Sequence, residues 1–71
     1  MIRHPEKFPA IVKEVRKQLR ISQEELAHEL GVSFSTINRW ENGKAVPSKL
    51  AQRQFDQFCA KKRKVGELKD G

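Results

Sequence analysis

The chain contains no tyrosine, a single cysteine and no long apolar run. One cysteine, Cys59, excludes an internal disulfide and a zinc site built from clustered cysteines, so we expect a reducing, cytoplasmic environment. The longest uncharged apolar stretch covers only residues 8–12. A stretch this short predicts neither a membrane-spanning helix nor a secretory signal peptide, and we expect no membrane partner.

The length and charge of the chain narrow its range of partners. Its 71 residues suffice for one small domain with little room for a catalytic cleft. A net charge of +6 favours an anionic partner, either nucleic acid or an acidic membrane surface. Five basic and two acidic residues in 61–71 supply half of that excess. Net charge is therefore weak evidence about the partner of the folded part, and the choice between nucleic acid and a membrane has to be made from the spacing of residues.

Helix-start and helix-stop residues recur along the chain, whereas no segment alternates apolar and polar residues as a strand would. The sequence therefore predicts an all-α, compact domain of four to five helices. Four expected helices cover residues of about 9–20, 23–30, 34–42 and 48–60.

The first helix is expected to begin at Pro9, because proline suits the first helical position. Phe8 is assigned to an irregular arm, residues 1–8, because a residue before proline is pushed out of helical geometry. The predicted buried stripe of this helix consists of Ile11, Val15 and Leu19, with Val12 beside it.

Serine residues mark the starts of the other helices. Ser22 and Glu25 have the spacing of a capping box, and Gly31 suits the end of that helix because its cap favours a positive φ. Ser33 and Ser48 can cap the third and fourth helices. The fourth helix has one apolar face and closes a folded domain of residues 9–60; residues 61–71 are expected to form a basic, flexible tail. That face carries Ala51, Phe55, Phe58 and Cys59.

Two short helices joined by a three-residue turn containing glycine describe a helix-turn-helix. Ala27 supplies the small side chain that two closely crossing helices need, and Gly31 permits the tight turn. Apolar residues at fixed offsets would then lock the two helices at one angle, so that the second presents its outer face to a DNA groove. These are Leu26, Leu30, Val32, Ile37 and Trp40.

These residues resemble the phage repressor and Cro group of helix-turn-helix proteins, the XRE family. The resemblance runs from Val15 to Phe58 and implies a lambda-repressor-like DNA-binding domain, usually of a transcriptional regulator. It departs from the family where Arg20 replaces the usual glycine, where helix four lacks its usual leucines, and where no fifth helix follows. The matching segments are residues 22–27, 30–33, 35–37, 40–44 and 47–48.

The resemblance also implies roles for single residues. A salt bridge would join Arg16 of helix one to Glu41 at the end of helix three. Gln23, at the start of helix two, would contact a DNA phosphate. Asn42 and Lys44, which end helix three and begin the following loop, would do the same.

A rotation of 100° per residue divides helix three into two faces. Ile37, Trp40 and Glu41 point inward, whereas the opposite face is wholly polar. There Arg39 suits guanine and Asn38 suits adenine, while Ser35 can serve any base or a phosphate. Phe34 lies on the flank, and the family uses that position for a base contact, here with a thymine methyl. The predicted base contacts are Phe34, Ser35, Asn38 and Arg39; the predicted phosphate contacts are Ser22, Gln23, Thr36, Asn42 and Lys44.

The sequence therefore predicts sequence-specific binding of double-stranded DNA by a transcriptional regulator. A DNA-binding antitoxin, a fragment of a larger regulator and a protein-interaction module that kept the fold are the alternatives. We expect no enzyme, since no nucleophile–base or paired-carboxylate group can be placed in a cleft. No cofactor, small-molecule substrate or metal is expected, because His4 and His28 are isolated. We expect a monomer that pairs weakly on DNA through Ala45 and Val46.

Overall fold

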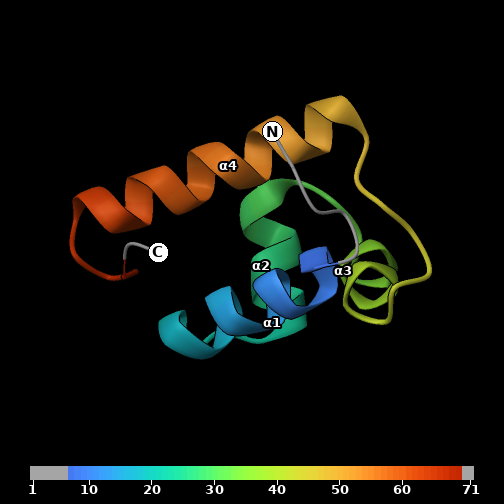
Figure 1. The fold of residues 1–71 in the computed structure, drawn as a ribbon, viewed down its shortest axis with the longest axis horizontal. Coiled ribbons are helices and arrows are strands. Elements are labelled where there is room, and N and C mark those ends of the chain that lie inside the picture. Colours follow the sequence, from blue (N-terminus) through green and yellow to red (C-terminus); the bar gives the residue numbers. More distant parts are fainter. Residues whose placement is uncertain (1–6, 70–71) are drawn as a thin grey trace.

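The computed structural model describes residues 7–69, and within that range the chain forms four helices and no strand. α3 packs against α1 and α2, and α4 packs against α2 from across the core (Figure 1). The all-α prediction is confirmed. In the described range no helix combines the length and apolar character needed to cross a bilayer. The helices are α1 (Phe8–Leu19), α2 (Gln23–Leu30), α3 (Phe34–Glu41) and α4 (Lys49–Lys64).

Local capping groups set the helix starts as predicted. The Glu25 backbone N–H donates to Ser22 Oγ at 3.0 Å, and the Ser22 N–H donates to Glu25 Oε1 at 2.9 Å. Ser33 and Ser48 cap α3 and α4 by accepting hydrogen bonds from the backbone N–H groups of Thr36 and Ala51. Gly31 has φ +70° and ends α2, so only three residues separate α2 from α3. The short turn fixes how α3 is presented.

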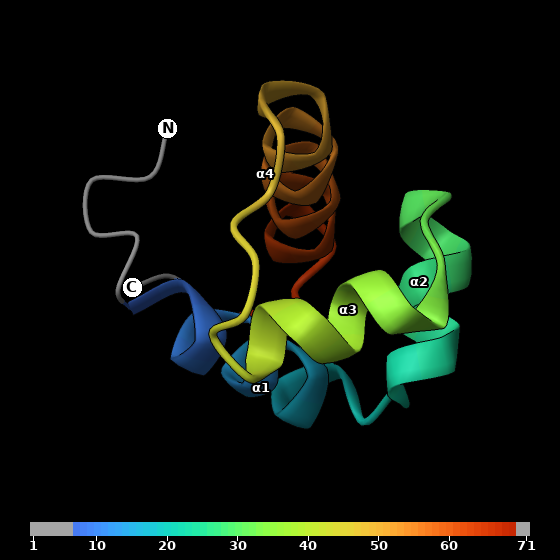
Figure 2. The same cartoon turned by 90° about the vertical axis from the view of Figure 1, so that its right-hand side faces the viewer.

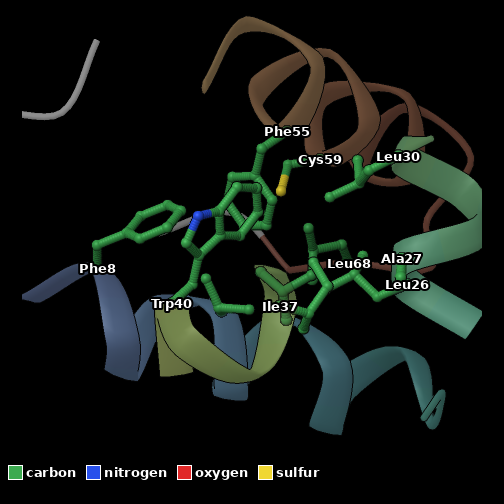
Figure 3. Close-up of a cluster of buried hydrophobic side chains, with 11 residues drawn as sticks. Phe8, Leu26, Ala27, Leu30, Ile37, Trp40, Phe55, Cys59 and Leu68 are labelled. Atoms are coloured by element: carbon green, nitrogen blue, oxygen red, sulfur yellow. The ribbon is translucent and has the colours of Figure 1, made fainter. Parts of the chain in front are cut away.

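The start of α1 differs from the prediction. Phe8 is not part of an arm: it begins the helix and is only 1% exposed. Its ring makes edge contacts with the rings of Trp40 and Phe55, each with centroids 5.4 Å apart (Figure 3). Burial of a large aromatic ring outweighs the backbone restriction imposed by the next proline. Residues 1–6 of the predicted arm, including His4, lie outside the described residues.

The buried stripe of α1 is also rotated from the predicted one. Phe8, Val12 and Val15 are buried at spacings of four and three residues, whereas Ile11 is 44% exposed. Because Phe8 joins the stripe, its centre moves to Val12. The helix ends at Leu19, and Arg20 adopts the left-handed conformation (φ 57°) that the family's usual glycine would take without strain.

The end of α4 lies four residues beyond the predicted one. Lysine and arginine favour helices, and their charges favour the negative end of the helix dipole, so residues 61–64 continue the helix. Gly66, with φ +82°, then reverses the chain, and Leu68 enters the core with 5% exposure (Figure 3). Residues 61–69 are therefore not a separate tail; residues 70–71 lie outside the described residues.

Replacement of Leu68 tests this reassignment. Leu68→Ala removes a buried side chain and should lower the free energy of unfolding by about 2–5 kcal/mol, a large share of the ~5 kcal/mol expected for a small domain. The matched control is Val65→Ala, since Val65 is 61% exposed. Urea unfolding followed by circular dichroism measures both variants. Equal stability of the two would place Leu68 in solvent.

Candidate nucleic-acid interface

α3 lies at one end of the molecule (Figure 1), and the loop to α4 begins beside its last turn (Figure 2). Its inner face is fixed in the core, since Ile37, Trp40 and Glu41 are 0%, 2% and 4% exposed. Ser35 and Arg39, on the outer face, are exposed. The division into a buried inner face and a polar outer face is thus present as the sequence indicated.

Two of the predicted base contacts have surroundings that the sequence did not specify. Phe34 is 48% exposed at the start of α3, so much of its ring lies in solvent. Asn38 is half-buried, because it lies against α2 and not at the crest of the outer face. Ser35 and Arg39, one helical turn apart, are the two predicted polar base contacts that are exposed.

The ion pair between Arg16 and Glu41 joins α1 to the last turn of α3. Arg16 Nε donates to Glu41 Oε2 at 2.6 Å, and Arg16 Nη2 donates to Glu41 Oε1 at 2.8 Å. Arg16 Nη1 also donates to the carbonyl of Ile21 at 3.1 Å, beside the start of α2. The two-pronged contact is the geometry that a guanidinium and a carboxylate favour.

The hydrogen bonds from Arg16 hold the pKa of Glu41 below its ordinary value. Burial of the carboxyl group opposes them, and a hydrogen bond from Gln23 adds to the lowering. The same contact raises the pKa of Arg16. Glu41 is therefore a buried anion whose charge is stabilised by donors from α1 and α2 together.

Three amide side chains extend the hydrogen bonds of the Arg16–Glu41 pair to the surface. Gln23 Nε2 donates to Glu41 Oε1 at 3.0 Å, and Asn38 Nδ2 donates to Gln23 Oε1 at 3.3 Å. Asn42 Nδ2 donates to Asn38 Oδ1 at 3.0 Å. We call Gln23, Asn38 and Asn42 the amide chain. The sequence predicts a separate DNA contact for each of these residues. The four-residue spacing of Asn38 and Asn42 is the one sequence signal that two of them meet.

The other predicted phosphate contacts lie at the ends of α2 and α3. Ser22 is exposed, with its hydroxyl oxygen accepting the capping bond of α2. Thr36 is half-buried, and its hydroxyl lies 2.9 Å from that of Ser33. Lys44 is exposed in the loop after α3, where its backbone N–H donates to the carbonyl of Arg39 at 2.9 Å.

No other cluster in residues 7–69 suggests a reactive centre. That range contains no group of three or more histidine, cysteine or acidic side chains able to hold a metal ion. Burial raises the pKa of the Cys59 thiol to about 11, so the thiol stays protonated at neutral pH. His28 is exposed on α2. The candidate functional site is therefore the outer face of α3 together with the adjoining residues at the start of α2 and in the loop after α3.

Comparison with protein families matches residues 12–51 to the helix-turn-helix family. The chain belongs to that family. The matched segment runs from α1 through the turn into the start of α4 and so includes the whole polar face described above. It is a DNA-binding helix-turn-helix domain of the XRE type with a lambda-repressor-like fold, as the resemblance implied. No solved structure matches the chain.

One relative places a similar helix-turn-helix inside a much longer protein. An alignment 43 residues long covers 56% of this chain, and within it the sequence is 46% identical to the type II methyltransferase M1.ScrFI of Lactococcus lactis subsp. cremoris. Those residues make up only 11% of the methyltransferase, so the chain covers about a tenth of that relative's length.

The lowered pKa of Glu41 predicts a specific pH dependence of stability. A carboxyl group with a lowered folded-state pKa stabilises the fold above its ordinary pKa and loses that contribution as the pH falls through the folded value. At pH 7, Glu41→Gln should therefore lower the free energy of unfolding by about 2 kcal/mol. The difference from wild type should shrink as the pH falls from about 4.3.

Urea unfolding at several pH values measures this effect. Glu29→Gln is the matched control, because Glu29 is exposed on α2, and it should follow the wild-type curve throughout. A Glu41→Gln difference that stays constant from pH 7 to pH 2 would mean that the charge of Glu41 does not stabilise the helix-turn-helix.

Proposed function

We propose that the chain is a sequence-specific regulator of transcription that inserts α3 into the major groove of double-stranded DNA. The observation that carries the proposal is the polar outer face of α3, held outward by the buried inner residues Ile37, Trp40 and Glu41. A helix with this division suits the groove, where base edges offer donors and acceptors. The proposed regulator acts in the cytoplasm, catalyses no reaction, and uses no cofactor or small-molecule substrate.

In this proposal Arg39 reads a guanine through its O6 and N7 atoms, and Ser35 contacts a base or a phosphate on the same ridge. Phe34 presses its exposed ring on a thymine methyl group. The phosphate contacts come from the two ends of the motif, where hydroxyl, amide and ammonium donors face phosphate oxygens. They are Ser22, Gln23, Thr36, Asn42 and Lys44.

Arg39→Ala tests the proposed recognition face. Selection from random duplexes would first define the preferred site of the wild-type protein. On that site Arg39→Ala should cost about 1–3 kcal/mol of binding and relax the preference at one base pair. Lys64→Ala removes the same charge at the far end of α4 and should keep the preference. Unchanged affinity and preference for Arg39→Ala would mean that α3 does not read bases.

The salt dependence of binding shows which basic residues contact DNA phosphates, those beside α3 or those at the end of α4. α4 has 16 residues and is therefore about 24 Å long, and it ends on the opposite side of the molecule from α3 (Figure 1). Lys44→Gln should reduce the slope of log affinity against log salt by about 0.9, the value for one phosphate contact. Lys64→Gln should leave that slope unchanged; the reverse result would move the DNA to the end of α4.

We further propose that two copies pair weakly on DNA. The loop after α3 and the first turn of α4 expose Val46 and Leu50, which are 68% and 66% exposed, and Ala45 lies beside them. Neighbouring half-sites would raise the local concentration of the domains, so a small apolar contact suffices. Duplexes carrying two selected half-sites should bind the second copy more tightly than the first, whereas independent binding would exclude the contact.

A second candidate is the DNA-binding part of a larger protein or of an antitoxin. The partial match to a methyltransferase favours it, because there a similar segment is a small fraction of a long chain. A protein-interaction module that kept the fold is less favoured, since the outer face of α3 is polar and not apolar or acidic. Repression of a reporter by this chain alone, from a promoter carrying the selected site, supports the regulator; DNA binding without any effect on the reporter supports the larger assembly.

A further inference from the structure

We infer that Asn38 does not read adenine but is a positioning residue that holds Gln23 and Asn42 for contact with the phosphate backbone. The inference rests on the proposed function, since it assigns base reading and phosphate contact to different residues of the same DNA-binding surface. Its basis is that both polar atoms of Asn38 already have protein partners: Nδ2 donates to Gln23 Oε1 and Oδ1 accepts from Asn42 Nδ2.

The ion pair between Arg16 and Glu41 determines the orientation of each amide group in the amide chain. Arg16 can only donate and ionised Glu41 can only accept, so Gln23 has to present its NH₂ group to Glu41. The carbonyl oxygen of Gln23 then faces Asn38, which has to present its own NH₂ group in turn. The carbonyl oxygen of Asn38 is left to accept from Asn42. A change at any member therefore affects the next one.

The orientation suits phosphate contact at the two outer members. Phosphate oxygens only accept hydrogen bonds, and each amide NH₂ group has two hydrogens. Gln23 uses one for Glu41 and Asn42 uses one for Asn38, which leaves one N–H on each for DNA. Gln23 lies at the start of α2 and Asn42 at the end of α3, so these donors come from both ends of the motif.

Base contacts are then made by residues of α3 that lie outside the amide chain. Ser35 and Arg39 are exposed, whereas Asn38 is half-buried against α2. A two-pronged contact with adenine needs the donor and the acceptor of one amide together, and in Asn38 both would have to be shared with Gln23 and Asn42. Loss of Asn38 should therefore weaken binding to every site and change the preference at none.

The test compares Asn38→Ala, Gln23→Ala and their double variant with the wild-type protein. Each is measured on the selected duplex and on a panel of single base-pair changes. Asn38→Ala should weaken binding roughly three- to ten-fold on all of them, with the order of preference unchanged. Removal of Asn38 from Gln23→Ala should weaken binding by less than removal of Asn38 from the wild-type protein, because part of the effect of Asn38 passes through Gln23 and the rest through Asn42. Arg39→Ala is the control that alters preference.

Alanine favours helices, and Asn38 is only half-buried, so the variant is expected to fold; circular dichroism checks this. Asn42→Ala, at an exposed residue, removes the other partner of Asn38 and should likewise weaken binding without changing preference. Relaxed preference at one A·T pair in Asn38→Ala would overturn the inference and leave the proposed function standing. Additive losses in the double variant would also overturn it. Failure of the wild-type protein to select any duplex would overturn both.

Discussion

The buried carboxylate of Glu41 is the group on which the arrangement of the helix-turn-helix depends. It is 4% exposed and accepts hydrogen bonds from Arg16 on α1 and Gln23 on α2 while it belongs to α3. A buried charge without partners is strongly unfavourable, so the three helices are stable together only where both donors reach it. The carboxylate thus fixes the position of α3 relative to α1 and to the start of α2.

The apolar core supports the same placement on the same inner face of α3. Trp40, one residue before Glu41, contacts the ring of Phe8, and Phe8 in turn contacts Phe55 of α4 (Figure 3). With the inner face of α3 fixed by apolar packing and its last turn fixed by an ion pair, the outer face has one orientation. A surface whose backbone is held in place in this way can meet a rigid DNA groove without rearrangement of the helices, which is what the proposed regulator requires.

The features that were predicted correctly depend on neighbours in the sequence. The capping serines, the glycine turn and the inward face of α3 each follow from spacings of a few residues. The errors involve distant partners: Phe8 was misplaced because its contacts, Trp40 and Phe55, are 32 and 47 residues away along the chain. Leu68 reaches the core only because α4 continues to Lys64 and the chain then reverses. The hydrogen bond from Asn38 to Gln23 had no sequence signal, since it joins two helices.

The central claim is that DNA lies against the outer face of α3, and mapping of backbone amide signals by nuclear magnetic resonance tests it most directly. Addition of a duplex carrying the selected site should shift the signals of residues 22–24 and 34–44 most strongly. Residues 61–64, at the far end of α4, should change little (Figure 1). The largest shifts at residues 61–64, with those of α3 unchanged, would contradict the account.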